Sequence, residues 1–579
     1  MSLSLSLSPS KFPVCRAFPV LALGLALLGL MPAGPAWAQA PAAPAAPADS
    51  APSPTAEAAS ASAALQPAAI YQARCASCHG AQRTGGMGPA LLPESLERLR
   101  PAELLSVITR GRQATQMAGF GTAAGGPLQP AEIAALAAWV RSPVVPAPQW
   151  TDADVRASRV DGPPAPPDEP ARPVWQADPM NLFIVVEGGD HHVSLVDGDR
   201  LEVIHRFPSR FALHGGPKFS PDGRYVYFGS RDGWITKYDL WRLRVVAEVR
   251  AGLNMRNVAV SGDGHWVMAA NYLPHTVMLF DEQLNLVRSY PATALDGQGG
   301  SSRVSAVYDA EPRKSFVVAL KDLPELWEIS YDPKAEPIYD GYVHDYKMGE
   351  GIAKPGYLNI RRTRLDQPLD DFFFDPSYRD VIGATRPHPA AGGAAAQAAT
   401  AQVVNLDVRR KIADLPLAGM PHLGSGITFE HQGRRVLASP NLQGGPDGTG
   451  RIDVIDLATW KPVAQISVPG PGFFLRSHEK TPYAWTDSMM SPTAHDTLTI
   501  LDKRTLKVVG QVREPGKTLA HIEFTRDGRY ALASLWEMDG AVIVYDAATF
   551  REVKRLPMSK PVGKYNLYNK LTRSEGTSH

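Results

Sequence analysis

The sequence predicts a chain of two folded domains, a small all-α domain followed by a large all-β propeller. Three observations support this prediction. The chain has 579 residues, more than a single hydrophobic core usually serves. A short region with helical periodicity follows the N-terminal segment. A long region then repeats a pattern of short strands and tight turns up to the end of the chain.

Residues 1–38 have the features of a secretory signal peptide. Lys11 and Arg16 precede the apolar stretch FPVLALGLALLGLM, and a cleavage pattern of the Ala-x-Ala type ends at Ala38. The apolar stretch is shorter than the ~20 residues that a membrane span needs. We therefore expect an exported, periplasmic protein whose mature chain has no membrane span.

Two Pro-rich segments divide the rest of the chain. Residues 39–64 are rich in Ala, Pro and Ser, and such a composition buries too little apolar surface to become ordered, so it predicts a linker. Residues 146–175 form a second Pro-rich linker. The domains are then 65–145 and 176–579. Positive and negative residues nearly cancel, with 59 Lys and Arg against 58 Asp and Glu, which argues against binding nucleic acid through net charge.

The first domain carries helical patterns around one short motif. Three amphipathic segments, PAAIYQARCASC, PAELLSVITRG and QPAEIAALAAWVRS, each begin near a proline, a residue favoured in the first helical turn. Cys75, Cys78 and His79 form the pattern C-x-x-C-H. The sequence has one further cysteine, Cys15, which lies in the signal peptide. In an exported protein this pattern attaches one c-type haem covalently, and the histidine becomes a ligand of the iron.

The cysteine motif has two other interpretations. A thioredoxin-like redox pair needs a βαβ context, and a zinc half-site needs matching ligands elsewhere in the sequence. Haem attachment fits better. For the distal iron ligand we expect Met117, whose loop resembles the Met-Pro-x-Phe loop of class I cytochromes c with Ala118 in place of the proline. Met87 is the rival candidate.

The second domain repeats one pattern along its length. FSPDGRYVYFGSRDGWITKYDLW, from Phe219, is echoed by VSGDGHWVMAANYLPHTVMLFDEQ, from Val260, and by FTRDGRYALASLWEMDGAVIVYDAAT, from Phe524. Each copy indicates a strand, an Asp-Gly hairpin, a strand, a turn and a further strand. At ~50 residues per blade, about 400 residues would form about eight blades. We therefore expect an all-β eight-bladed propeller.

A class I cytochrome c domain before a propeller that ends in KPVGKYNLYNKL resembles the cytochrome cd1 family. In that family the propeller binds haem d1 non-covalently in its central funnel, and the best-known members reduce nitrite to nitric oxide. HRFPSRFALHGGPKF, DDFFFDPSYR, GMPHLGSGITFE, GPGFFLRSHEKTPYAWTD and LWEMDGAVIVYD resemble more closely the dihydro-haem d1 dehydrogenases of haem d1 biosynthesis. This resemblance implies oxidation of a propionate side chain to an acrylate, with electrons passed to haem c.

The resemblance also implies roles for residues of the propeller. His214 matches the position of the proximal iron ligand. The carboxylates of the macrocycle need partners such as arginine, which binds them through two hydrogen bonds. The positions that match such contacts are Arg231, Arg256 and Arg303, with Arg476 and His478 as weaker additions.

The dehydrogenation needs a base, because forming a C=C bond from CH2–CH2 removes two protons as well as two electrons. A neutral imidazole is the usual base near neutral pH. His422 and His521 are the candidates, either as the base or as a distal contact of the iron. His422 lies in a glycine-flanked loop, which favours a site position. The nitrite reductases pair two distal histidines, and the second possible match here, His344, is followed by a long insertion.

Two alternative functions stay open at this point. One is a cytochrome cd1 nitrite reductase, and the other is a haem d1 carrier without turnover. The favoured function implies a tetrapyrrole substrate, a periplasmic electron acceptor, and the nitrite reductase as recipient of the product. No role is assigned to His191, His192, His275, His388 or His495.

Overall fold

A computed structural model describes residues 66–577, except for 98, 113–115, 165, 167–171, 296–299, 340–352, 386–400, 416 and 418. The signal peptide, the first linker, His344 and His388 lie outside the described residues. Among the described residues, none of the helices combines the length and the apolar character that a membrane crossing requires.

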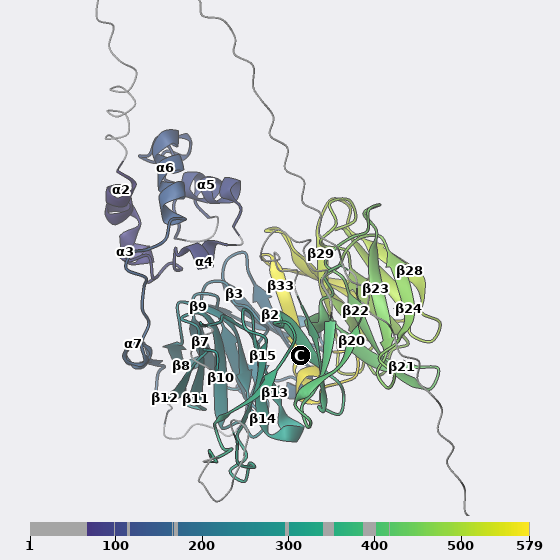
Figure 1. Cartoon of the computed structure of the whole chain (residues 1–579). Coiled ribbons are helices and arrows are strands. Elements are labelled where there is room, and N and C mark those ends of the chain that lie inside the picture. Colours follow the sequence, from purple (N-terminus) through teal and green to yellow (C-terminus); the bar gives the residue numbers. More distant parts are fainter. Residues whose placement is uncertain are drawn as a thin grey trace, which may run out of the picture. The chain divides into compact units, whose positions relative to one another are not determined.

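Short helices form the first domain (Figure 1). Prolines occupy the first turns of α2, α4, α5 and α6, where the missing N–H group is not needed. Tyr71, Leu104 and Leu136 lie in the core of this domain. The prediction of an all-α domain is confirmed. The elements are α2 (Pro67–Arg74), α3 (Ala76–His79), α4 (Pro93–Leu96), α5 (Pro101–Arg110), η1 (Thr122–Ala124) and α6 (Pro130–Val140).

The strands of the described residues form eight sheets, so the predicted eight-bladed propeller is confirmed. From the inner to the outer strand, the blades consist of β33 (Pro561–Asn566), β2 (Leu182–Glu187), β3 (His192–Asp197) and β4 (Glu202–Pro208); β5 (Lys218–Phe219), β6 (Tyr225–Gly229), β7 (Trp234–Asp239) and β8 (Arg244–Arg250); β9 (Asn254–Val260), β10 (Trp266–Leu273), β11 (Thr276–Asp281) and β12 (Leu286–Pro291); β13 (Val304–Ala310), β14 (Ser315–Leu320), β15 (Glu325–Ser330) and β16 (Ile360–Arg364); β17 (Asp371–Phe374), β18 (Asp380–Ala384), β19 (Ala401–Asn405) and β20 (Arg410–Leu415); β21 (Ile427–His431), β22 (Arg434–Pro440), β23 (Gly450–Asp456) and β24 (Pro462–Val468); β25 (Leu475–Ser477), β26 (Tyr483–Asp487), β27 (Thr497–Asp502) and β28 (Lys507–Arg513); β29 (Leu519–Phe524), β30 (Tyr530–Leu535), β31 (Ala541–Asp546) and β32 (Glu552–Pro557).

The two ends of the propeller sequence meet in the first blade. β33, from the C-terminal part of the chain, pairs antiparallel with β2 and becomes the inner strand of that blade. Figure 1 shows β33 in yellow beside β2. This pairing joins the two ends of the propeller sequence and closes the ring of blades. The short helix α8 (Leu567–Leu571) follows β33 directly.

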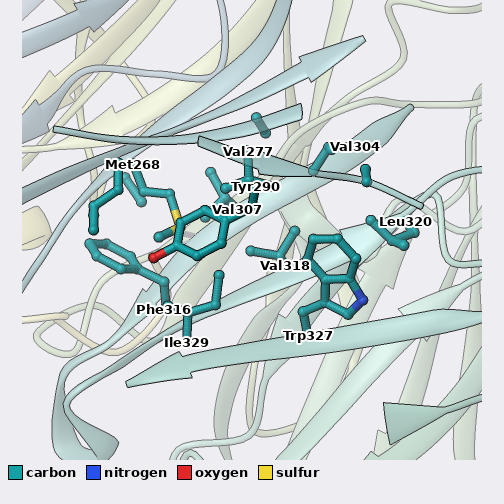
Figure 2. Close-up of a cluster of buried hydrophobic side chains, with 14 of the residues drawn as sticks. Met268, Val277, Tyr290, Val304, Val307, Phe316, Val318, Leu320, Trp327 and Ile329 are labelled. Carbon is teal, nitrogen blue, oxygen red and sulfur yellow. The ribbon is translucent and has the colours of Figure 1, made fainter. Parts of the chain in front are cut away.

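Hydrophobic side chains fill the space between neighbouring blades. Figure 2 shows one such cluster between the third and fourth blades, in which Met268, Phe316 and Trp327 pack together. Trp327 is fully buried. Because each blade is covered on both faces, its inner and middle strands are buried along their length, and β14 is one example. This close packing holds the inner strands, which carry the candidate site, in fixed positions.

Part of the predicted second linker is folded onto the propeller. The helix α7 (Asp152–Ala157) is capped by Thr151, and β1 (Val160–Asp161) pairs with β8 at the outer edge of the second blade. Val155 is fully buried among side chains of the propeller. Trp150 donates a hydrogen bond of 3.0 Å from its indole N–H to the carbonyl of Arg250. The Pro-rich composition concealed this helix, although Thr151 and its partner three residues later are a recognisable cap.

Candidate functional site

The cysteine motif lies at the junction of two helices. Cys75 separates α2 from α3, and Cys78 and His79 lie in α3. Both thiols are free, and Cys75 is buried. The ring of His79 is also buried, and its Nδ1 lies 2.8 Å from the carbonyl oxygen of Pro89. Because a carbonyl only accepts, Nδ1 carries the proton and the lone pair on Nε2 is available to a metal.

The surroundings of His79 fit a covalent haem. Burial lowers the pKa of His79, which favours the neutral imidazole that binds iron. A Cβ atom on Gly88 would lie 2.7 Å from Cε1 of His79, so only glycine allows the chain to approach the ring this closely. Met117 is half-buried, whereas Met87 is 75% exposed. Met117 remains our prediction for the distal ligand.

A second group of candidate residues lies on the inner strands of the propeller or in the loops just before them. These residues are far apart in the sequence. In the structure a series of contacts and electrostatic interactions joins them around the axis, with Phe474 as the link between Phe473 and His521. We call this set the inner ring. Its members, one per blade from the second blade round to the first, are His214, Arg256, Tyr308, Asp371, His422, Phe473, His521 and Tyr565.

His214 is held in one tautomer by its neighbours. Its Nδ1 lies 2.8 Å from the carbonyl oxygen of Arg256. Its Nε2 lies 2.9 Å from Nη2 of Arg231. A guanidinium only donates, so Nε2 accepts and Nδ1 carries the proton. This is the same arrangement as in His79, and it leaves on Nε2 the lone pair that an iron atom would use.

Positive side chains gather around Tyr272, which is buried in the third blade. The charged groups of Arg231, Arg303 and Lys321 each lie 5.7 Å from the centre of its ring. Arg303 also pairs with Asp322, at 2.7 Å. The structure therefore brings two of the predicted carboxylate-binding residues together. Lys321 and Tyr272 were missed, because nothing in their local sequence distinguishes them from ordinary blade residues.

His422 lies against an acidic residue of the neighbouring blade. Its Nδ1 is 2.9 Å from the carbonyl oxygen of Phe473, so Nε2 again carries the lone pair. Nε2 lies 3.9 Å from a carboxylate oxygen of Asp371. The side chain of His422 is 11% exposed. The ring of His422 lies 4.0 Å from the ring of Phe473, measured between centres.

His521 has a different environment. It is buried, with its ring centre 4.5 Å from that of Phe474 and 5.2 Å from that of Tyr565. The backbone N–H of Lys564 points to Nδ1 at 3.5 Å, which places the ring proton on Nε2. That Nε2 has no hydrogen-bond partner among the described residues. Burial, and then the charges of Lys564 and Arg476, hold the pKa of His521 well below its usual value.

Buried cations surround the inner ring. Arg476 is 4% exposed and donates to the carbonyl of Leu475 at 2.7 Å. Burial lowers the pKa of Lys218 to about 8 and that of Lys570 to about 7, and holds that of Lys564 well below its usual value. A ligand with several carboxylates would stabilise the charged forms of these groups, so their burial here favours such a ligand. The lysines were missed, although a lysine inside the buried run PVGKYN was a usable signal.

The structure does not bring His478 to the inner ring. It follows the end of β25, whereas the ring residues of this blade precede that strand. Its Nδ1 accepts from the backbone N–H of Lys480 at 3.1 Å and lies 2.7 Å from where a Cβ of Gly528 would be. Burial lowers the pKa of His478 to about 4. These contacts come from the hairpins at the other end of the inner strands.

Comparisons with known families cover both domains. Residues 177–340 and 353–570 match the family described as "Cytochrome D1 heme domain". Residues 62–140 match the family described as "Cytochrome C oxidase, cbb3-type, subunit III". The cysteine motif and the inner ring lie within these two matches.

Individual relatives span most of the chain. A dihydro-heme d1 dehydrogenase of Pseudomonas aeruginosa is 52% identical over 513 residues, which is 88% of this chain and 95% of the relative. A nitrite reductase of Stutzerimonas stutzeri is 26% identical and covers 87% of this chain and 92% of its own. The solved structure of dihydro-heme d1 dehydrogenase NirN in complex with DHE has a TM-score of 0.77 and 52% identity, over 87% of this chain and 100% of that one. The chain therefore belongs to the family of the cytochrome d1 haem domain, with a c-type cytochrome domain preceding its propeller.

Proposed function

We propose that this protein is a dihydro-haem d1 dehydrogenase, an oxidoreductase that completes haem d1. The observation that carries this proposal is the 52% identity, over 88% of the chain, to the Pseudomonas aeruginosa enzyme of that name. The inner ring supports it from the chain's own residues. It combines two histidines that present an Nε2 lone pair, one neutral histidine with the opposite tautomer, and buried cations around them.

The reaction converts the propionate group –CH2–CH2–COO⁻ of the tetrapyrrole substrate into the acrylate group –CH=CH–COO⁻. Two C–H bonds break, two protons leave, and two electrons leave with them. The protons need a base close to the side chain. The electrons need an acceptor. Cys75, Cys78 and His79 would hold haem c, which would supply one-electron transfer to an external electron acceptor.

His422 is our candidate for the base. The carbonyl of Phe473 holds the proton on Nδ1, so the lone pair that can take a proton from the substrate is on Nε2. The carboxylate of Asp371 lies 3.9 Å away and favours the positive charge that the ring then acquires. His521 is less suited to this role, because its Nε2 carries a proton and burial disfavours a second one. It can instead donate a hydrogen bond to the substrate.

The cations around the ring bind the substrate in this proposal. Arg231 and Arg303 lie beside Tyr272, and Arg256 lies against His214. Guanidinium groups bind carboxylates with two parallel hydrogen bonds and so fix the orientation of the macrocycle. His214 is our candidate for the proximal ligand of its iron. Arg231, which now lies 2.9 Å from Nε2 of His214, would be available to a carboxylate of the substrate if His214 held the iron.

The proposal also includes a periplasmic location, an external electron acceptor and a recipient of the product. The signal-peptide pattern of residues 1–38 supports a periplasmic location. The external acceptor would be a one-electron carrier in the periplasm, and the product would pass to a cytochrome cd1 nitrite reductase that uses haem d1. The tetrapyrrole is then both the substrate of one protein and the cofactor of the next.

The experiment is an anaerobic incubation of the full-length protein, with haem c attached, with dihydro-haem d1. We expect the chromophore spectrum to change to that of haem d1 and the extracted pigment to lose two hydrogen atoms by mass spectrometry. A pigment that is bound but unchanged would support the carrier instead. Nitric oxide formed from nitrite by the protein loaded with haem d1 would support the nitrite reductase.

A further inference from the structure

Asp371 occupies a special place in the inner ring, at the first position of β17. It is buried, with 4% of its surface exposed. One carboxylate oxygen lies 3.9 Å from Nε2 of His422. The other accepts a hydrogen bond of 3.0 Å from the hydroxyl of Tyr308, on the inner strand of the preceding blade, and one of 3.0 Å from the backbone N–H of Phe372. These contacts fix the carboxylate between two blades.

The loop that carries His422 is shaped around this carboxylate. Gly424 lies two residues after the histidine in the stretch PHLGSG, within η5 (Leu423–Ser425). A Cβ atom at Gly424 would lie 2.0 Å from the carboxylate oxygen that faces His422. Any side chain there would displace either the loop or Asp371. The close approach of the carboxylate therefore explains why position 424 is a glycine.

The distance between His422 and Asp371 also has a chemical meaning. With the proton on Nδ1, the lone pair of Nε2 faces a negative oxygen, and at 3.9 Å the two atoms are not hydrogen-bonded. Once Nε2 takes a proton, the two groups form an ion pair, and a small approach of the two atoms would make it a charge-assisted hydrogen bond. The arrangement is thus better suited to the state after proton transfer than to the state before it.

We propose that Asp371 is a positioning residue for the dehydrogenation, which orients His422 and stabilises its protonated ring, and that Tyr308 holds Asp371 in place. The proposal rests on the function proposed above. In the step concerned, a C–H bond of the propionate group breaks and an N–H bond forms on Nε2 of His422. The two electrons of the overall oxidation leave through haem c, and Asp371 gains no proton and no electron.

A competing role for Asp371 is purely electrostatic. Its charge also acts on Lys218 and Arg256, so it could serve only to balance the cations that bind the substrate. That role would show in substrate affinity. A positioning role would show in the conversion rate at saturating substrate, with affinity little changed. The two measurements therefore separate the roles.

The test uses full-length protein with haem c attached and two variants, Asp371→Asn and Tyr308→Phe. We expect Asp371→Asn to slow conversion of bound dihydro-haem d1 at least about 10-fold, as expected when support for a general base is lost, and Tyr308→Phe to slow it by a smaller factor. The dissociation constant of the substrate, from spectral titration, should stay within about 3-fold of the wild-type value. Melting temperatures check that both variants fold.

Tyr331→Phe is the matched control. Tyr331 also donates its hydroxyl to a half-buried aspartate of an inner strand, Asp309, at 2.8 Å, but neither residue belongs to the inner ring. We expect wild-type conversion from this variant. Wild-type rates in Tyr308→Phe and Asp371→Asn would overturn the proposal, and so would losses of affinity that account for the whole effect. A wild-type protein that converts no substrate would instead overturn the proposed function.

Discussion

The cytochrome domain and the propeller build their sites in opposite ways. In the cytochrome domain Cys75, Cys78 and His79 lie within a single stretch of the chain, at the junction of α2 and α3. In the propeller the inner ring takes one residue from each blade, from His214 to Tyr565. The first site can be recognised from its sequence alone. The second exists only when the blades close.

The same contrast applies to the histidines. His79, His214 and His422 all have Nδ1 next to a backbone carbonyl oxygen, so their Nε2 atoms carry lone pairs. His521, a neighbour of the same ring, has the opposite tautomer and a strongly lowered pKa. The residue type alone therefore does not show which histidine suits which role. The backbone atoms next to each ring fix its tautomer and so decide the role.

The largest expected effect comes from the local site. The double variant Cys75→Ala, Cys78→Ala removes both points of haem attachment, so electrons from the substrate have no internal acceptor. We expect no detectable conversion, while the propeller still binds dihydro-haem d1. Haem staining of the denatured protein and a spectral titration measure the two properties separately. Conversion at the wild-type rate without covalent haem would show that the two sites are not coupled.

The next effect tests the non-local site. His422→Ala should slow conversion about 100-fold, the usual contribution of a general base, with the substrate still bound. The exposed His265 provides the control, since its side chain is 69% exposed in the described structure. Single-turnover rates at saturating substrate give the comparison. Equal rates for His422→Ala and His265→Ala would remove His422 from the mechanism.

A third variant separates binding from chemistry within the ring. His214→Ala should weaken substrate binding about 10- to 100-fold, because it removes the proposed proximal ligand and its orienting contact with the carbonyl of Arg256. The conversion rate of the substrate that still binds should change less. Titration of the variant, followed by the visible spectrum, measures the affinity. An unchanged affinity would assign the iron ligand to another residue.

The smallest effect concerns pH. Lys218 has a pKa lowered by burial to about 8, so it is charged at pH 7 and largely neutral at pH 9. Affinity for the anionic substrate should therefore fall several-fold as the pH rises from about 7 to about 9, and Lys218→Met should flatten this dependence. Lys314, whose side chain is 62% exposed, is the control, and Lys314→Met should keep the wild-type pH dependence.

The sequence predicted the architecture well for a physical reason. Helical periodicity and Asp-Gly hairpins are local signals, and the all-α domain and the eight blades follow from them. The folded part of the second linker was missed, because α7 is short and surrounded by prolines. Its burial depends on a surface of the propeller that the local sequence does not reveal.

The candidate site was predicted only in part. Arg231 and Arg303 do come together, but they do so around Tyr272, which no motif indicated. His478 was a weaker addition that the resemblance implied, and the strand β25 carries it to the other end of the blade. Asp371 was overlooked because its partner, His422, belongs to a different blade. The local sequence around either residue does not reveal a pair of side chains that forms between two blades.

The central claim is that the propeller oxidises its tetrapyrrole and the cytochrome domain receives the electrons. The most direct test is a single-turnover experiment with the oxidised full-length protein, in which acrylate product and reduced haem c are measured together. We expect two electrons to reach haem c and its external acceptor for each acrylate formed, with both signals rising at the same rate. Product formed while haem c stays oxidised, or haem c reduced without product, would contradict the account.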